Sequence, residues 1–588
     1  MEVKAGNFSS LSGSGQVIIP FFQRPYVWKE AQWKQFFEDL HSSYKLNRAH
    51  FLGSVILQDT PSTSGGYSQD TLVIDGQQRL TTFSILIKAL YDTLEDEQQQ
   101  DYKQCLFQKP VQKKMPKIQH SKCDAPHFTR ILQANTSTDL GDAPRDNRLL
   151  QAYIHFSQTL KDKQLLEHSQ EFLDYLTESD LWVVIRLDTY EDAQQIFDSI
   201  NTAGLRLSAT DIIKNALFDR TKSLRDDYET LYTKYWESVF EKDDTQRKFW
   251  EQETGKGSLK RIQSEVFLHA FAIIKGFFDV EKDTLEKLSM VYKKHIKGLD
   301  KECLEDLLQE LHRYALLYKD LPHDHTQEFG FDDFTLKLFN TMRVTKIYSA
   351  IPLILYIQAL GDTKVIQEGF CWLEMLILTY WLCKESYKNF GFFFGKLTRD
   401  LCKQKNQNSE ALLQFLKESL LKHKPEKAKI EQYLKSSEGV LLSNDRAALV
   451  LFSLELYRRR QHEGNSSKLA YDYSLEHLMP VKWEAHWSNV VGTEGNDLEK
   501  KSRAERLIYQ IGNMVLLEKT LNTAIGNHGW HTKLYGDGSK KKNLSNYDRL
   551  STTKEILNVS QWDASNIEVR TQRLSQEFLE MIDQLSLK

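Results

Sequence analysis

The sequence has few cysteines, no long apolar run and almost no net charge. Its six cysteines are dispersed without a C-x-x-C pair, and the start MEVKAGNFSS lacks the basic and then apolar residues of a secretion signal, so a reducing cytoplasm is the expected location. The most apolar stretches, 351–360 and 371–383, are too short to span a bilayer, and the second contains Glu374. Both therefore predict buried helices, and a membrane is not an expected partner.

The formal net charge of −4 gives the whole chain no attraction for nucleic acid, so any polyanion site must be a local basic patch. Repeats of fixed period and low-complexity tracts are also missing, which argues against solenoids and propellers. The 40% of apolar and 11% of aromatic residues are typical of folded domains. A chain of 588 residues predicts about two to four of them.

Apolar patterning changes along the chain. Short strand-like runs separated by turns come first, and helical runs with a further strand-like stretch at 181–187 follow. From about 225 to 445 the chain is rich in Leu, Lys, Glu and aromatic residues, which predicts a long helical region. After the polar break at 461–470 a small mixed α and β pattern begins. We therefore predict an α+β, multidomain protein with domains at 1–225, 226–440 and 441–588.

The stretch LVIDGQQRLTTF at 72–83 predicts a strand, a glycine turn and the start of a helix. The apolar residues that follow are spaced by three and four positions, as on one helical face: Leu80, Phe83, Ile87, Leu90 and Leu94. Farther along, Ser208 with Asp211 three residues later predicts a capping box at the start of another helix.

The turn after this strand is suited to binding an anion. Asp75 ends the strand, Gly76 turns the chain, and the helix N-terminus presents free backbone N–H groups together with the side chains of Gln77, Gln78 and Arg79. The guanidinium of Arg79 is a planar donor for phosphate oxygens, and Asp75 is suited to a magnesium ion or to orienting the turn. Most Asp-Gly pairs, however, are only turns.

The segment PFFQRPYVW at 20–28 concentrates aromatic residues around Gln23 and Arg24. The aromatic rings are suited equally to stacking on a base and to forming the core of a β-hairpin, and the sequence leaves both open. Gln23 and Arg24 are harder to bury without partners. We therefore expect them to have a polar role near a nucleotide or DNA.

Near the C-terminus, DYSLEHLMPVKWE at 472–484 predicts a short strand that stops near Pro480. Alternation places Glu476 and His477 on opposite faces of its end. A histidine accepts a proton from water at neutral pH and a carboxylate holds a hard divalent cation, so the pair is suited to metal-assisted phosphodiester hydrolysis. For an isolated Glu-His pair, a surface or capping histidine is the plainer alternative.

Asparagines and basic residues follow this pair. Asn513 precedes Asn522 by nine positions, with the apolar run 515–517 between them as a short buried strand that leads into a helix or turn. From His531 to Arg549, five basic residues outnumber two acidic ones: Lys533, Lys540, Lys541, Lys542 and Arg549 against Asp537 and Asp548. This local excess provides a patch for phosphates, although the run 540–542 is equally well explained as a solvated loop.

The order Glu-His, asparagine with an apolar run and a later asparagine resembles the HNH (His-Me finger, ββα-metal) nuclease motif. The resemblance implies that His477 is the general base, Glu476 a metal ligand, Asn513 the hairpin-stabilising asparagine and Asn522 the metal ligand on the helix. The cysteine pairs of many HNH proteins are missing, so no structural zinc is implied.

Both ends of the chain resemble one group of defence proteins. LNTAIGNHGWHTK at 521–533 is similar to the C-terminal motif of GmrSD-type modification-dependent (type IV) restriction endonucleases, which implies catalytic roles for Asn527 and Lys533, the lysine holding a phosphate. Four N-terminal segments resemble the first domain of GmrSD-type and SspE-type proteins: IPFFQRPYVW, HFLGSVIL, VIDGQQRLTTFSILIKAL and IFDSINTAGLRLSATDIIKN. That domain is similar to the ParB/sulfiredoxin fold, in which a turn at the place of 76–79 grips nucleotide phosphates.

The resemblance implies a cytoplasmic anti-phage endonuclease that cuts or nicks DNA. Its implied cofactors are Mg²⁺ or Mn²⁺ and a nucleoside triphosphate, which the N-terminal domain binds and hydrolyses. The implied partner is double-stranded DNA, above all modified phage DNA, and a homodimer is left open. Two other functions also stay open: a nucleotide-gated reader of modified DNA without nuclease activity, and a toxin-like nuclease.

Overall fold

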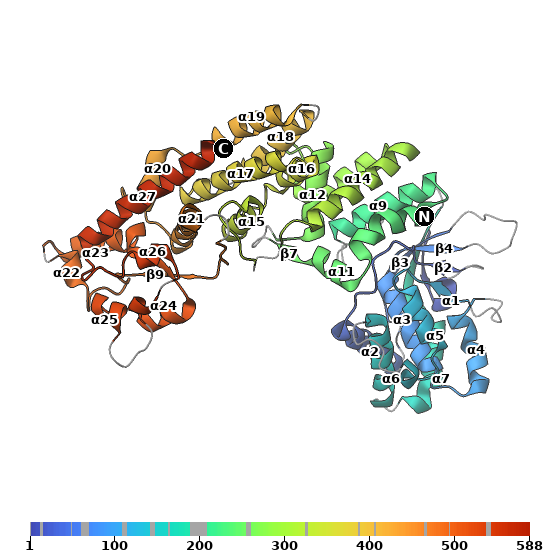
Figure 1. Ribbon diagram of the computed structural model, residues 1–588. Helices are drawn as coiled ribbons and strands as arrows, with labels where there is room; N and C mark the ends of the chain where they lie inside the picture. The colour runs from blue at the N-terminus through green and yellow to red at the C-terminus, as the bar shows by residue number, and fades with distance from the viewer. Residues whose placement is uncertain are drawn as a thin grey trace. The chain divides into compact units, whose positions relative to one another are not determined.

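The structure is a computed structural model that describes residues 2–587 except 12–15, 47, 49, 60–69, 109–114, 141–146, 163–164, 189–207, 255–259, 324–326, 386–388, 405–406, 464–466, 493, 537–542 and 548. Contacts divide the chain into two compact units, Met1–Ser223 and Leu224–Lys588, which are described one at a time (Figure 1). The boundary predicted at 440 has no counterpart in this division and stays a prediction.

A mixed sheet in the order β1-β6-β3-β4-β2-β5 organises the first unit. β1 is antiparallel to β6 and β4 to β3, whereas the pairs β3–β6, β2–β4 and β2–β5 are parallel. The strand predicted at 181–187 is confirmed as β6. The strands are β1 Glu2–Gly6, β2 Val17–Ile18, β3 Ser54–Asp59, β4 Thr71–Asp75, β5 Ile118–Gln119 and β6 Trp182–Leu187.

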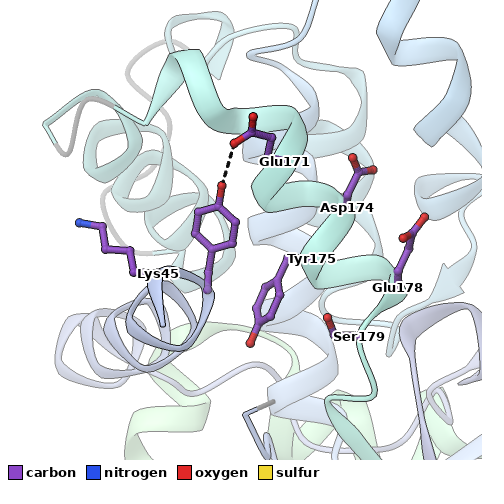
Figure 2. A pocket seen from close by; sticks show the side chains of 7 residues that line it. Lys45, Glu171, Asp174, Tyr175, Glu178 and Ser179 are labelled. Atoms are coloured by element: carbon purple, nitrogen blue, oxygen red, sulfur yellow. Dashed lines mark hydrogen bonds between the residues drawn. The ribbon is translucent and has the colours of Figure 1, made fainter. Parts of the chain in front are cut away.

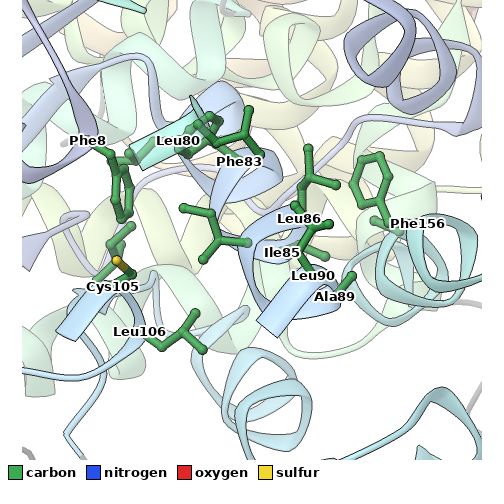
Figure 3. Packing of buried hydrophobic residues seen from close by; sticks show 14 of the residues in the cluster. Phe8, Leu80, Phe83, Ile85, Leu86, Ala89, Leu90, Cys105, Leu106 and Phe156 are labelled. Carbon is green, nitrogen blue, oxygen red and sulfur yellow. The ribbon is translucent and has the colours of Figure 1, made fainter. Parts of the chain in front are cut away.

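The helices of the first unit pack around α3 Gln77–Tyr91 (Figure 3). Leu80, Phe83 and Leu90 of the predicted apolar stripe are at most 1% exposed, so they form the centre of this core. The side chains of α3 meet Phe8, Cys105 and Phe156 from neighbouring helices. The other helices are α1 Phe8–Leu11, α2 Glu30–Lys45, α4 Asp96–Leu106, α5 Ala125–Gln133, η2 Ser137–Leu140, α6 Arg148–Asp162, η3 Leu166–His168, α7 Ser169–Glu178 and α9 Ala209–Leu224.

Two local predictions in this unit are confirmed. β4 ends at Asp75, Gly76 takes the left-handed conformation with φ of 93°, and α3 begins at Gln77. A glycine suits this turn because it lacks the Cβ that disfavours positive φ. At the start of α9 the backbone N–H of Asp211 donates to Ser208 Oγ at 3.1 Å, and the backbone N–H of Ser208 donates to the Asp211 carboxylate at 3.3 Å, which is the predicted capping box. The preceding part of that motif, 196–207, lies outside the described residues.

The second unit begins with the predicted helical region. One short hairpin, β7 Glu253–Thr254 with β8 Arg261–Ile262, interrupts it; two-residue strands are too short to show an alternating pattern. The helices are α10 Tyr228–Tyr232, the π-helix η4 Thr233–Glu241, α11 Asp244–Glu251, α12 Gln263–Lys275, η6 Leu285–Lys287, α13 Leu288–Lys297, α14 Lys301–Lys319, α15 Phe334–Thr345, α16 Ile351–Leu360, α17 Thr363–Leu382, α18 Phe390–Lys403, α19 Ser409–Leu421, α20 Lys427–Leu434 and α21 Asn444–Glu463.

The two most apolar segments are buried helices, as predicted. α16 and α17 contain fully buried side chains, and Glu374 inside α17 is 1% exposed. Its carboxylate pairs with Lys337 at 3.5 Å and accepts a hydrogen bond from Thr341 at 2.9 Å, which compensates its burial. Across the described ranges, no helix is long and apolar enough to cross a membrane.

The last part of the second unit mixes strands and helices, as predicted. β9 Ser474–His477 pairs antiparallel with β10 Met514–Leu517, all of which is buried, so the predicted apolar strand is confirmed. α24 Lys519–Ile525 follows β10 directly. The remaining elements are α22 Ser488–Val491, α23 Asp497–Ile508, η9 Ile511–Asn513, α25 Trp530–Tyr535, η10 Leu544–Asn546, α26 Ser551–Lys554 and α27 Ala564–Leu587.

Candidate active site

A two-stranded hairpin and the helix after it bring the predicted C-terminal residues together. In the register of β9 and β10, His477 faces Met514 and Glu476 faces Val515. One more backbone hydrogen bond, from Leu478 N to Asn513 O at 2.9 Å, continues the pairing beyond the strand. His477 therefore lies at the last residue of β9, where the chain leaves the sheet.

Asn513 fixes the chain just past His477. Its side chain is fully buried; Oδ1 accepts from Met479 N at 2.9 Å and Nδ2 donates to Met479 O at 3.0 Å. Nδ2 also donates to Ile508 O at 3.1 Å, and Trp562 Nε1 donates to Oδ1 at 3.3 Å. The amide donates and accepts at once, and its four hydrogen bonds are consistent with the hairpin-stabilising role that the resemblance implied.

Asn522 ties α24 back onto β9. Its Nδ2 donates to Ser474 Oγ and to Leu475 O, both at 3.0 Å. The amide therefore closes a strand, strand and helix unit in which β9, β10 and α24 are mutually fixed. Asn527 lies farther on, between α24 and α25, and is exposed.

The imidazole of His477 is held in a largely apolar setting at the end of β9. Its Nε2 is buried and has no hydrogen-bond partner among the described residues, while the ring packs edge-on to Tyr509 with centroids 5.6 Å apart. Burial, reinforced by the charge of Lys533, lowers the pKa of His477 to about 4. The lowered pKa keeps the ring uncharged at neutral pH, and an uncharged imidazole has one ring nitrogen that can accept a proton.

Glu476 forms a buried ion pair with Lys533 of α25. The ammonium contacts Glu476 Oε1 and donates to His477 O at 2.9 Å, and the side chains are 13% and 0% exposed. Burial raises the pKa of Glu476 and lowers that of Lys533, and each charge opposes the shift of the other. In this arrangement Lys533 holds the end of β9 from inside, and a fully buried ammonium does not reach a phosphate.

Each implied metal ligand has a protein partner in this arrangement, and its role in metal binding stays a prediction. The carboxylate of Glu476 forms an ion pair with the ammonium of Lys533, and the amide nitrogen of Asn522 hydrogen-bonds to β9. Within the described part of the chain, no group of three or more His, Cys, Asp or Glu side chains could hold a metal ion. In the predicted basic patch, Arg549 pairs with Glu518 at 2.6 Å, and 537–542 and 548 lie outside the described residues.

In the first unit the turn between β4 and α3 gathers Asp75, Gly76 and Arg79. Arg79 Nη2 pairs with the Asp75 carboxylate at 3.3 Å and Nη1 donates to Leu52 O at 3.4 Å. A Cβ on Gly53, whose φ is 112°, would collide with this guanidinium, so the glycine makes room for it. Asp75 and Arg79 are about a quarter exposed, which leaves both open to solvent at the turn.

The segment 20–28 lies against this turn, and its glutamine has a partner in the sheet. Gln23 Nε2 donates to Val73 O of β4 at 2.9 Å. Gln78 accepts from Val27 N at 2.8 Å and donates to Pro25 O at 3.2 Å, so it holds the segment to α3. Arg24 is half-buried on the segment, and Gln77 is half-buried in the first turn of α3.

The aromatic rings of this segment divide between core and rim. Phe22 and Tyr26 are 3% and 4% exposed, which favours the core alternative for these two. The Tyr26 hydroxyl lies 2.6 Å from Thr82 Oγ1 and accepts from Trp33 Nε1 at 2.8 Å, so the ring is anchored to α2 and α3. Phe21 and Trp28 are half-buried.

Two surface pockets lie away from all of these residues. One of about 560 Å³ lies between α2 and α7, and its lining residues include Tyr44, Glu171 and Tyr175 (Figure 2). Tyr44 donates to Glu171 across it at 3.1 Å. The other, of about 520 Å³, includes Phe249 and His323 in its lining. Neither pocket is lined by the predicted C-terminal residues, which β9, β10 and α24 bring together, so we place the candidate active site at β9.

The sequence analysis missed the residues behind the hairpin. Arg570, Trp562 and Tyr509 contact the hairpin from outside the motif. One signal was present: Arg570 occupies the apolar stripe of α27, three positions after Ile567 and four before Leu574. A charged residue on a buried helical face requires a specific partner.

Comparison with known families matches both ends of the chain. Residues 7–218 match the GmrSD restriction endonuclease N-terminal domain, and residues 424–577 match the C-terminal domain of the same enzymes. The two segments together span more than half of the sequence and contain the β4–α3 turn and the β9–β10 hairpin, respectively. A comparison with curated proteins finds no match. The chain therefore belongs to the GmrSD-type type IV restriction endonucleases, defence enzymes that act on DNA.

Proposed function

We propose that the unit formed by β9, β10 and α24 is an HNH-type nuclease site that cuts or nicks DNA, with His477 as the general base. The observation that carries this proposal is the histidine at the end of β9, whose Nε2 has no partner among the described residues and whose pKa is lowered by burial. The backbone on either side of it is fixed: Asn522 bonds to Leu475 before it and Asn513 to Met479 after it. A base held this firmly meets the geometric demand of proton transfer.

In the proposed reaction the imidazole of His477 takes a proton from water as the water oxygen attacks phosphorus. The new phosphorus–oxygen bond forms as the bond to the leaving oxygen breaks, and that oxygen is protonated from solvent. The Lys533 ammonium bonds to the His477 carbonyl and fixes the peptide next to the base. Loss of the base alone should slow cleavage by about a hundredfold to ten-thousandfold.

We further propose that the ParB-like N-terminal unit binds a nucleoside triphosphate at the β4–α3 turn and that the nucleotide controls cleavage of modified DNA. The N-terminus of the 15-residue helix α3 and the partly exposed guanidinium of Arg79 support this assignment. The side-chain amides of Gln23 and Gln78, by contrast, hydrogen-bond to the backbone of the first unit. Arg79→Ala should therefore weaken nucleotide binding more than Gln77→Ala does.

The test is a cleavage assay on modified and unmodified plasmid DNA, with and without each triphosphate. It compares the wild type with His477→Ala and with His486→Ala, a matched control because His486 is exposed. The resemblance still predicts Mg²⁺ or Mn²⁺, so every reaction runs with each ion and with a chelator. We expect nicked or linear DNA from the wild type and His486→Ala only.

Other outcomes would replace the proposal. Cleavage by His477→Ala at the wild-type rate would remove the histidine from the reaction. Intact DNA in every lane, with DNA retained on the protein, would make the chain a nucleotide-gated reader. Degradation of unmodified host DNA or RNA would identify a toxin-like nuclease.

A further inference from the structure

The C-terminal helix α27 runs from the hairpin to the helical region. Near its start it packs against η9, and farther along it packs against α21, α20 and α17. At its far end Asp583 pairs with Lys427 at 2.5 Å and Ser586 accepts from Lys424 at 3.1 Å. One straight element therefore fixes the turn before β10 to helices distant in sequence.

Arg570 makes the contact between α27 and the hairpin. Its Nη1 donates to Gly512 O at 2.6 Å and to Met514 O at 2.8 Å, the carbonyls on either side of Asn513. Its Nη2 donates to Thr552 O at 2.8 Å, and Nε pairs with Glu555 at 2.6 Å. The residue is 3% exposed, and three backbone acceptors and one carboxylate compensate its charge.

Next to this contact, α27 lies close to the backbone of Gly512. The backbone N–H of Gly512 donates to Thr571 Oγ1 at 3.1 Å, and a Cβ on Gly512 would collide with Ile567 O and with the backbone and hydroxyl of Thr571. A side chain at this position would push α27 away from the turn. The absence of a side chain at Gly512 is therefore what lets Arg570 reach both carbonyls.

We propose that Arg570 is a positioning residue for the nuclease reaction, acting through Asn513 on His477. The guanidinium holds the carbonyls of Gly512 and Met514, and this sets where the Asn513 side chain grips Met479, two residues past the base. The inference rests on the proposed role of His477. It adds that α27, outside the nuclease motif, sets the geometry of the site.

The chain offers a matched control in Arg458. It pairs with the same Glu555 at 2.8 Å and with Glu577 through two bonds of 2.7 Å, but no hydrogen bond or ion pair of it reaches the hairpin among the described residues. Arg570→Lys and Arg458→Lys both keep one charge beside Glu555, and each loses the fork geometry of the guanidinium. Arg570→Lys loses hydrogen bonds to the hairpin, whereas Arg458→Lys loses only bonds to Glu555 and Glu577.

The experiment measures kcat, KM and the amide hydrogen exchange of 474–479 and 511–517 in the full-length chain. We expect Arg570→Lys to lower kcat on the order of a hundredfold with KM unchanged, because small misplacements of a catalytic group cost about that much. Exchange in both segments should rise. Arg458→Lys should leave kcat and the exchange of these segments at wild-type values.

The milder variant Thr571→Val keeps the proposal testable if Arg570→Lys fails to fold. It removes the acceptor for Gly512 N and should lower kcat in the same selective way, by a smaller factor. Equal kcat for the Arg570 and Arg458 variants, in a chain whose cleavage depends on His477, would overturn the inference. Cleavage that survives His477→Ala would instead overturn the proposed function. The exchange data would still show whether Arg570 fixes the hairpin.

Discussion

Replacing Asn513 with alanine should open the hairpin more than any other single change to an amide in the site. The side chain makes four hydrogen bonds in a fully buried position: to Met479 N and O, to Ile508 O and to Trp562 Nε1. A buried group left without its partner costs about 1–3 kcal/mol. If each of the four groups that lose a partner costs about 1 kcal/mol, the free energy of opening the hairpin falls by about 4 kcal/mol.

Asn522→Ala is the internal comparison for this value. Asn522 is half-buried and makes two bonds, to Ser474 Oγ and Leu475 O, so its loss should cost about 1–2 kcal/mol. Asn513→Asp nearly preserves the shape of the side chain but removes both donated bonds and places a carboxylate against two carbonyls. It should therefore behave like Asn513→Ala and not like the wild type.

The assay is native-state hydrogen exchange followed by mass spectrometry on peptides that cover 474–479 and 511–517. It reports local opening, which suits a chain with two units better than a single melting curve does. Equal effects of Asn513→Ala and Asn522→Ala, or wild-type exchange in Asn513→Asp, would refute the assignment of the hairpin's stability to these bonds.

Three further predictions concern charge, pH and backbone. Lys533→Met leaves the buried carboxylate of Glu476 unpaired and should destabilise the second unit by about 3–5 kcal/mol in urea unfolding, with partial recovery in the Glu476→Gln double variant. The pKa of His477 is lowered from 6.5 to about 4, so between these pH values the unfolded chain takes up a proton that the folded chain does not. The contribution of His477 to stability is therefore complete above pH 6.5 and is lost as the pH falls to about 4. The acid limb of kcat should lie near pH 4, and a limb near 6.5 would contradict the burial of the ring. Gly76→Ala forces a Cβ at φ of 93° and against Val55, and should destabilise the first unit by about 1–2 kcal/mol in thermal unfolding. Gly391→Ala in α18 of the second unit, where the added Cβ meets nothing, should not destabilise the unit that contains it.

The elements that the sequence predicted are those specified by neighbouring residues. The β4–Gly76–α3 turn needs one strand, one glycine and a helical stripe, and the Ser208–Asp211 cap needs residues three apart. β10 is a run of four buried apolar residues between polar ones. Patterns of this range are visible without knowledge of the fold.

The elements that the sequence did not predict depend on residues far apart. Glu476 and Lys533 meet across 57 positions, and Gln23 and Val73 across 50. Whether a lysine near a motif holds a phosphate or an internal carboxylate depends on its burial, which no local pattern reports. The same holds for Arg570, whose two acceptors at the hairpin lie 56 and 58 positions away.

In each of the two motifs, the β4–α3 turn and the β9–β10 hairpin, one side-chain amide has a structural role. Gln78 accepts from Val27 N and donates to Pro25 O, and Asn513 accepts from Met479 N and donates to Met479 O. In both places an amide grips the backbone of a preceding segment with one donor and one acceptor. A carboxylate lacks the donor and an ammonium the acceptor, so neither can replace it. These two amides thus fix the backbone at each motif, and the proposed ligand-binding and catalytic roles fall to Arg79 and His477.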